Sequence, residues 1–423
     1  MTAATEAPPR IATLDIVRGV AVMGILAMNI VAFAMPPMAY MNPLAYGTET
    51  GADYVSWLAS FIFVDGKMRG LFSFLFGASI LLVIQRAQAK DEPAKSIHYR
   101  RMAWLLIFGL IHYYFIWYGD ILTGYALIGM LAWLFRDKQP RGLIKWGIGL
   151  LIPQFMLMAL MAMGYFAASA AAAAPGADAD VLRQWSEMEA SFAIPSAQAL
   201  SETMALYRGD YGGIVAHQLD EGLFVQVFMT ILFGFETLAY MLFGMAALKS
   251  GFLKGQWSDA RYRKTALIGF GIGIPVYALL AWLLVRDGFS APMIVALVWA
   301  ATVPFRPAMI VATAAFVIVL TRRGGALVER IAAAGRAAFT NYLGTSIVMT
   351  TVFYGYGFGL FGQLGRAELW LVVIGMWAAM LIWSKPWLDR FHYGPFEWAW
   401  RSLSRFKLQP MRKAGAPSTA VAA

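Results

Sequence analysis

Long apolar runs recur along almost the whole chain and restrict its fold more than any other feature. An α-helix needs about 20 mainly apolar residues to cross a bilayer core, and such runs recur from Ile16 to Trp387 with no long soluble stretch between them. The chain is 60% hydrophobic and 14% charged, whereas soluble domains are about 45 to 50% apolar and about 25% charged. The sequence therefore predicts an all-α polytopic transmembrane bundle that forms one integral membrane domain over residues 1–423.

We expect about ten membrane-spanning helices, an even number that places both termini on the same side. The expected spans are residues 14–34, 69–86, 101–118, 120–135, 145–168, 222–248, 264–285, 290–320, 336–355 and 368–388. Residues 53–64 are too short to span and predict an additional interfacial or re-entrant helix. The 290–320 run is too long for one straight span and contains Pro304 and Pro307, so we expect a break near its middle.

Basic residues lie in alternate connections between the predicted spans. The four basic clusters are Arg86, Lys90, Lys95, Arg100 and Arg101; Arg136, Lys138, Arg141 and Lys145; Lys249, Lys254, Arg261, Arg263 and Lys264; and Arg322, Arg323, Arg330 and Arg336. Cytoplasmic loops are rich in such residues. The 35–52 connection has neither Lys nor Arg, and the 171–221 connection holds eight acidic residues. We therefore predict a multi-pass protein of the bacterial inner membrane with both termini cytoplasmic.

This topology assigns roles to two further segments. Residues 171–221 become a large periplasmic loop, and residues 390–423 become a cytoplasmic interfacial helix with a basic tail. The formal net charge of +10 then reflects membrane orientation, not a nucleic-acid partner. The expected partners are the lipid bilayer and a small-molecule or lipid substrate, while the sequence leaves the oligomeric state open. The chain has no cysteine, which excludes thiolate catalysis and thiolate metal sites, and we expect no metal.

The first predicted span carries three polar residues that should face the bundle. Asp15 and Arg18 are three residues apart, and Asn29 falls on the same side of the helix. A charge at the bilayer centre costs at least about 2.5 to 3.5 kcal/mol, so each needs a partner or a wet cavity. Two interpretations stay open here: Asp15 and Arg18 form a structural pair, or the three residues bind an anionic substrate.

His112 is the histidine that this topology places inside the membrane. Counting from Arg101, it lies about 16 Å along its helix, near the middle of the bilayer, with Asp120 at the outer mouth. A neutral imidazole can accept a proton near pH 7 and is a natural general base. The alternative is a core histidine bonded to a carbonyl or a tyrosine, with Asp120 a helix cap or a partner of Lys67 or Arg69.

Other polar or aromatic residues extend the candidate site. The expected catalytic residues are His112, Asp120 and Lys67; the expected substrate-binding residues are Asp15, Arg18, Asn29, Arg69, Trp117, Arg306, Arg336, Asn341 and Tyr342. The aromatic run around Trp117 is also typical of an interfacial belt, and the polar group around Asn341 also fits interhelical hydrogen bonding. An ion pair between Glu236 and Arg306 can be imagined, but no sequence spacing supports it.

Short motifs distributed over nearly the whole chain resemble those of a known family. They are Leu14-Asp15-Ile16-Val17-Arg18-Gly19, Asn29-Ile30, Lys67, Leu75-Phe76-Gly77, His112, Trp117-x-Gly119-Asp120-Ile121-Leu122, Gly335-Arg336, Thr340-Asn341-Tyr342-Leu343 and Gly394-Pro395-x-Glu397-Trp398-x-Trp400-Arg401. In this order they resemble the bacterial YeiB-like family of polytopic membrane proteins, whose C-terminal half is a domain of unknown function. This family is distantly similar to transmembrane acyltransferases that use an intramembrane histidine. Thr345 stands where family members often carry Gln.

The residues and the resemblance together favour membrane-embedded acyl transfer. An acyl group would pass from a cytoplasmic donor such as acyl-CoA to an acceptor reached from the periplasmic side, with no permanently bound cofactor. His112 would be the general base, Asp120 its partner, and Lys67 or Arg69 an electrostatic contact. One alternative is a small-molecule transporter or permease that uses the broken 290–320 helix and its charges. A second alternative is a non-catalytic membrane scaffold.

The predicted topology can be tested with reporter fusions. A reporter joined after Ala173 should report the periplasm, and one joined after Ala423 should report the cytoplasm, because the basic loops set the orientation. If both fusions report the same side, the predicted number of crossings between them is wrong.

Overall fold

The computed structural model describes residues 11–413. Apart from one isolated bridge between Phe391 and Arg412, regular structure in these residues is helical. The helices are α1 (Ala12–Ala34), η1 (Pro37–Tyr40), α2 (Gly51–Ala59), η2 (Ser60–Val64), α3 (Lys67–Gln88), α4 (Ala94–Phe115), α5 (Leu122–Ala132), η3 (Trp133–Phe135), α6 (Pro140–Ala172), α7 (Ala179–Glu189), α8 (Ala197–Tyr207), α9 (Tyr211–Lys249), α10 (Asp259–Asp287), α11 (Ala291–Ile294), η4 (Val295–Ala300), α12 (Arg306–Thr321), α13 (Ala326–Arg336), α14 (Ala338–Phe353), α15 (Arg366–Arg390) and α16 (Pro395–Arg405).

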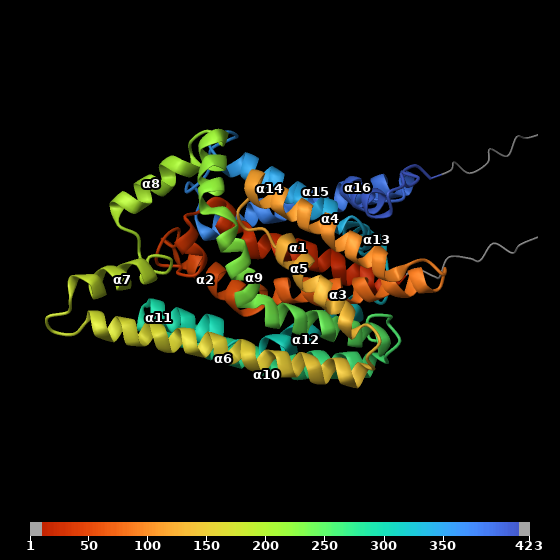
Figure 1. The fold of residues 1–423 in the computed structure, drawn as a ribbon, viewed down its shortest axis with the longest axis horizontal. Helices are drawn as coiled ribbons and strands as arrows, with labels where there is room; N and C mark the ends of the chain where they lie inside the picture. The colour runs from red at the N-terminus through yellow and green to blue at the C-terminus, as the bar shows by residue number, and fades with distance from the viewer. Residues whose placement is uncertain (1–10, 414–423) are drawn as a thin grey trace, which may run out of the picture.

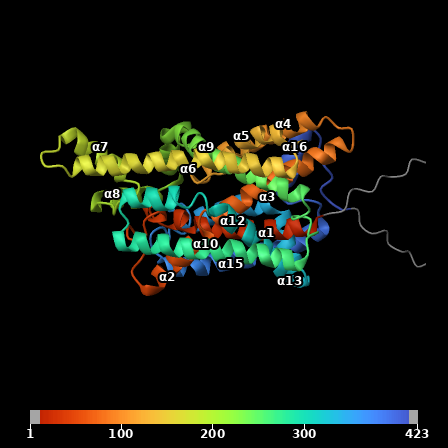
Figure 2. The ribbon, with the colours of Figure 1, turned by 90° about the horizontal axis from the view of Figure 1, so that it is seen from below.

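Long apolar helices run side by side along the longest axis of the molecule (Figures 1 and 2). Six helical stretches of the described residues are long and apolar enough to cross a membrane, namely α1, the stretch from α2 through α3, α6, α9, α10 and α15. The α5–η3, α11–η4 and α12 segments are shorter and also apolar. These helices confirm the predicted all-α polytopic membrane bundle.

Helix α1 lies inside the bundle, whereas α6 and α15 lie at its edge. In their most apolar windows, 67% of the residues of α1 are buried but only 22% of those of α6 and of α15. Helix α1 packs against α3, α13, α14 and α15. A helix that is apolar all round belongs in the interior, and one with exposed apolar residues in a membrane protein faces lipid. Polar groups on α1 are therefore held among other helices.

Both irregular segments expected from the sequence are present. Residues 51–64 form the short helix α2 and one π-helical turn, and the chain then turns at Gly66, with φ of 67°, into α3. The 290–320 run is divided into α11, η4 and α12, with turns over residues 301–305. Pro307 stands in the first turn of α12, where its missing N–H costs no helical hydrogen bond. The expected break is thus confirmed, and Arg306 stands at it.

The connection predicted to be a large outer loop is itself helical. It contains α7 and α8, which lie at the end of the molecule opposite α16 (Figure 1). Helix α9 begins at Tyr211 and has a non-helical residue at Gly222, with φ of 64° and ψ of −169°. The predicted start of this span, residue 222, therefore coincides with an interruption of the helical backbone within α9. Which side of the membrane this end faces stays a prediction.

Helices α3 and α9 approach each other closely through glycine. A side chain at Gly77 would lie 2.1 Å from the Met241 carbonyl oxygen, and one at Gly244 would lie 1.7 Å from the Phe74 carbonyl oxygen. Small residues allow helix backbones to pack at such distances in membranes. This crossing holds α3 and α9 together, and both helices carry charges of the site described below.

A helix is present within residues 390–423 as expected, namely α16, but its acidic residue has an unexpected role. Glu397 is buried and accepts hydrogen bonds from the backbone N–H groups of Phe339 and Thr340 at 2.6 and 3.1 Å and from the Thr340 hydroxyl at 2.5 Å. The first N–H groups of a helix have no partner within the helix, and the helix dipole favours an anion there. Glu397 therefore caps α14 and joins it to α16. Residues 414–423 of the predicted tail lie outside the described part.

Replacing this cap should destabilise the protein. We expect Glu397→Ala to lower the free energy of unfolding by about 1 to 3 kcal/mol, because buried N–H groups of α14 lose their acceptor. Thermal unfolding in detergent would measure the loss. Glu187→Ala on the exposed face of α7 is the control and should have little effect. Equal stability of the two variants would contradict the capping role.

Candidate functional site

A cavity of about 270 Å³ lies within the helix bundle. Parts of α1, α3, α5, α9, α10, η4 and α12 form its wall. Its charged lining residues are Asp65, Arg69, Asp120 and Arg306. Ligand sites are typically concave and mainly apolar, with a few placed polar groups. A cavity with four charged residues inside an apolar bundle is therefore the leading candidate site.

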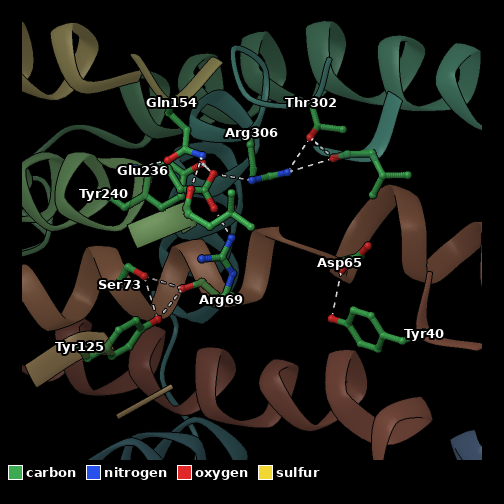
Figure 3. A network of polar contacts seen from close by, with 12 residues as sticks. Tyr40, Asp65, Arg69, Ser73, Tyr125, Gln154, Glu236, Tyr240, Thr302 and Arg306 are labelled. Carbon is green, nitrogen blue, oxygen red and sulfur yellow. Dashed lines mark hydrogen bonds and ion pairs between the residues drawn. The ribbon is translucent and has the colours of Figure 1, made fainter. Parts of the chain in front are cut away.

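One buried carboxylate joins two arginines at the edge of this cavity. Glu236 on α9 is fully buried and forms ion pairs with Arg69 on α3 and with Arg306 at the start of α12, the second at 2.5 Å. Figure 3 shows the carboxylate between the two guanidinium groups. An unpaired charge at this depth would cost several kcal/mol, so the pairs make its burial tolerable. No spacing between these residues in the sequence predicts that Glu236 contacts either arginine.

Neutral hydrogen bonds hold this ion-pair cluster in place. Gln154 on α6 accepts from the Glu236 N–H at 3.1 Å and donates to the Leu232 carbonyl at 2.9 Å. The Tyr240 hydroxyl donates to Glu236 at 3.2 Å. On the other side, the Tyr125 and Ser73 hydroxyls each donate to the Arg69 carbonyl at 3.0 Å. Five helices, α3, α5, α6, α9 and α12, thus meet in one polar network.

Asp65 and Lys67 lie beside the ion-pair cluster, and they form no hydrogen bond with each other. Asp65 accepts from the Tyr40 hydroxyl at 3.4 Å and lines the cavity (Figure 3). Lys67 is fully buried; its Nζ donates to the Phe61 carbonyl and lies 3.3 Å from the centre of the Tyr277 ring. This cation–π contact partly replaces the lost hydration of the ammonium. Lys67 is therefore held behind the wall of the cavity and is not among its lining residues.

His112 and Asp120 form a second polar cluster. His112 Nδ1 and Asp120 Oδ1 are 2.9 Å apart, and both side chains are completely buried. Asp120 also accepts from the Leu122 and Thr123 N–H groups at 3.1 and 2.8 Å, so it caps α5. Within the described residues, His112 Nε2 has no hydrogen-bond partner. When Nδ1 carries the proton shared with Asp120, Nε2 presents a free lone pair.

Aromatic rings enclose His112. The rings of Tyr342 and Trp117 lie 5.2 and 6.2 Å from the imidazole, centre to centre, and Trp117 stacks on Phe33 at 3.9 Å. The Tyr342 hydroxyl accepts from the Ile121 N–H at 3.4 Å. Trp117 and Tyr342 therefore form the enclosure of His112 and do not line the cavity. Asp120 belongs to both places, because it bonds to His112 and lines the cavity.

The three polar residues of α1 separate into two groups. Arg18 pairs with Asp15 at 3.1 Å and donates to Ser79 on α3 at 2.8 Å, which supports the structural-pair interpretation. Asn29 is buried and lines the cavity. They lie among other helices as expected, since Asp15 and Asn29 are buried and the Arg18 side chain is only 22% exposed. Asn29 lies near Asp120 and Arg69 in the cavity wall, and Asp15 and Arg18 do not.

The polar group near the start of α14 makes interhelical contacts. Asn341 donates to the Ala334 carbonyl at 3.0 Å and to Ser384 at 3.2 Å, and it accepts from Trp383 at 2.9 Å. These bonds join α13, α14 and α15. Arg336 ends α13 and lies outside the cavity lining. The structure thus favours the hydrogen-bonding interpretation of this group over substrate contact.

The structure therefore places four of the candidate residues around one cavity: Asn29, Arg69, Asp120 and Arg306. Sequence reasoning missed Asp65, Tyr40 and Tyr277 as lining residues and gave Glu236 no partner. The position of Asp65 could have indicated a role in the site, because Asp65 directly precedes the glycine turn into α3. In the part of the chain that the structure describes, no three His, Asp or Glu side chains are grouped to hold a metal ion.

The fold and its buried polar clusters define a polytopic helical membrane protein with an internal charged cavity. The chain belongs to the YeiB-like family. Over 401 residues it is 32% identical to the uncharacterized protein YeiB of Escherichia coli (strain K12), a match that covers 93% of this chain and 95% of the relative. Residues 247–407 match the family described as a protein of unknown function, DUF418.

A second relative also matches over nearly the whole chain. The uncharacterized protein YxaH of Bacillus subtilis (strain 168) is 32% identical over 422 residues, which is 96% of each chain. An uncharacterized 39.9 kDa protein of Bacillus acidopullulyticus is 37% identical over 122 residues, or 29% of this chain and 33% of its own. No solved structure matches the chain. These relatives establish the family, and their names assign no activity.

The double ion pair makes a stability prediction. We expect Glu236→Gln to lower the free energy of unfolding by about 3 to 5 kcal/mol, because Arg69 and Arg306 then lose their counter-charge in a buried site. Thermal unfolding in detergent would measure this loss. Asp180→Asn, which removes the exposed pair with Arg183, should change stability by less than about 1 kcal/mol. If both variants have the same melting temperature, Glu236 does not stabilise the network.

Proposed function

We propose that this protein is a membrane-embedded acyltransferase in which His112 is the general base. The observation that carries the proposal is the buried His112–Asp120 pair, in which Nδ1 is bonded to a carboxylate and Nε2 has no partner among the described residues. This is the orientation that a histidine base requires, because the carboxylate fixes the tautomer and stabilises the imidazolium that forms. A purely structural histidine would be expected to use both ring nitrogens.

The proposed reaction transfers an acyl group from a thioester donor such as acyl-CoA to a hydroxyl or amine. His112 Nε2 takes the acceptor proton while the acceptor oxygen or nitrogen bonds to the thioester carbonyl carbon. The carbon–sulfur bond then breaks, and the thiolate receives the proton from the imidazolium. The acceptor would occupy the cavity, which Asp120 connects to His112. Because His112 is fully enclosed, the proposal also requires its surroundings to open when the donor binds.

The expected membrane orientation determines from which side the donor and the acceptor would reach the site. In the proposal, the donor arrives from the cytoplasmic end, where α16 lies, and the acceptor enters from the end that carries α7 and α8 (Figure 1). Lys67 then acts at a distance as a buried positive charge, and Arg69 and Arg306 contact the acceptor directly. Asp15, Arg18 and Asn341 have structural roles in this proposal, and Arg336 lies outside the acceptor cavity.

One observation favours a second candidate function. Arg306 lies at the break between η4 and α12 and faces the cavity, an arrangement of broken helix and charge that transporters use to bind ions and small molecules. A permease would bind its substrate in the same cavity without needing the free Nε2 of His112. The two candidates therefore differ in their dependence on His112.

The proposed base can be tested by measuring acyl transfer and detergent melting on the same variants. His112→Ala should reduce turnover by about 10²- to 10⁴-fold, while donor binding persists. Asp120→Asn should also reduce turnover, because it loses the charge that stabilises the imidazolium.

A control histidine separates chemistry from folding. His217→Ala, on the exposed face of α9, should leave both activity and melting unchanged. A well-folded His112→Ala protein with full transfer activity would exclude the base, and the permease would become the better interpretation.

A further inference from the structure

We infer that the cavity binds a small molecule with an acidic group at one end and an amine at the other. This inference rests on the proposed function and deepens it, because such a molecule would occupy the cavity assigned to the acyl acceptor. It stands on three features of the cavity: an arginine with unused donors, a carboxylate with unused acceptors, and apolar walls between them.

Arg69 supplies the acid-binding end. Among the described residues, its Nη2 donates to Glu236, while Nε and Nη1 have no hydrogen-bond partner. Its side chain is 18% exposed and lines the cavity, so these N–H groups are accessible to a ligand. A guanidinium offers two parallel donors that match a carboxylate or a phosphate. Arg69 thus has one side anchored by the protein and one side available.

Further unused donors line the same cavity. Arg306 Nε, Trp299 Nε1 and the Tyr277 hydroxyl are buried and have no hydrogen bond of normal geometry among the described residues, although the Tyr277 hydroxyl lies close to the Arg306 guanidinium. Buried polar groups are nearly always satisfied in native proteins, by protein or by bound molecules. Three such groups around one cavity favour a ligand that accepts hydrogen bonds. The positive charge of Arg69 and Arg306 favours an anionic one.

Asp65 supplies the amine-binding end. Its carboxylate accepts one long hydrogen bond, 3.4 Å from the Tyr40 hydroxyl, and no cation within the described residues forms an ion pair with it. The nearby Lys67 ammonium attracts Asp65, but it forms no ion pair with it and donates its hydrogen bond to the Phe61 carbonyl. Asp65 is half-buried, and a ligand cation that contacts it directly would stabilise its charge in the apolar bundle. Figure 3 shows Asp65 and Tyr40 apart from the Arg69–Glu236–Arg306 cluster, so the two ends are separate.

The volume and walls of the cavity limit the ligand. The volume of about 270 Å³ is just below the range of about 300 to 1,000 Å³ that is typical of ligand sites, which suits a small molecule and not a whole lipid. Met28, Ile128, Met229, Phe233 and Trp299 form apolar parts of the wall. A short hydrocarbon segment between the acidic and amino groups would match this lining.

A smaller cavity adjoins the first at Asp65 and marks a path toward the α2 end. It has a volume of about 50 Å³ and includes Ser56 on α2 and Arg366 and Trp370 at the start of α15. Tyr40, Phe61 and Asp65 line both cavities, so the Tyr40–Asp65 hydrogen bond stands between them.

The test is binding of matched probes to the purified full-length protein in detergent. The probes are ω-aminoalkanoates from 3-aminopropanoate to 8-aminooctanoate, together with alkanoates and alkylamines of the same lengths. We expect one chain length of the aminoalkanoates to raise the melting temperature at lower concentration than its matched acid or amine. A charge-assisted hydrogen bond at each end should strengthen binding about tenfold or more over either single-charged probe.

Two variants assign the ends. Asp65→Asn should remove the preference for the aminoalkanoate over the alkanoate, and Arg69→Gln should remove its preference over the alkylamine. Arg183→Gln, whose side chain is exposed on α7, should bind like the wild type. Equal binding of the acid, the amine and the aminoalkanoate by the wild type would overturn the inference, as would unchanged preferences in both variants.

The outcome is separable from that of the proposed function. Binding of the aminoalkanoate by His112→Ala protein that has lost transfer would support both. Transfer that depends on His112, combined with no preference for any aminoalkanoate, would overturn the ligand class alone. Aminoalkanoate binding without any His112-dependent transfer would keep the ligand class and reject the acyltransferase.

Discussion

The architecture around the cavity depends on the burial of one carboxylate, Glu236. Moving a carboxylate out of water costs several kcal/mol, and here the cost is offset by two arginines and by the hydrogen bond from Tyr240, while Gln154 accepts from the backbone N–H of Glu236. The arginines come from α3 and α12, which are distant in sequence. The ion pairs therefore fix how three helices meet, and the cavity is the space that remains beside them.

The two polar clusters are coupled by residues that serve both. Asp120 caps α5, bonds to His112 and lines the cavity. Tyr125, one turn further along α5, bonds to the Arg69 carbonyl. Movement of α5 would consequently change the histidine enclosure and the arginine wall together. This coupling gives a physical route by which a ligand in the cavity would affect the accessibility of His112, and it links the proposed base to the proposed acceptor site.

Several features of the fold could be read from residue patterns because local physics determines them. The apolar runs located most of the long helices to within about five residues, although α4 and α9 begin at Ala94 and Tyr211, well before the predicted residues 101 and 222. The prolines near Arg306 marked the break, and the 53–64 segment was recognised as too short to span. The sequence also marked His112 and Asp120 as partners, since eight residues across a helix end and a turn restrict how far apart they can lie. It did not separate Asn29 from Asp15 and Arg18, because a shared helix face does not specify which neighbouring helix lies against each turn.

The sequence by itself determined that this is a membrane protein, that it is all-α, which family it belongs to, and which charged residues lie within apolar segments. Only the tertiary structure decided which groups each charged residue contacts. Glu236 meets Arg69 and Arg306, Glu397 caps α14 and Lys67 lies on the Tyr277 ring, although none of these pairs has an informative spacing. The physical reason is that hydropathy and helix period act within a segment, whereas the partner of a buried charge is set by how separate helices pack.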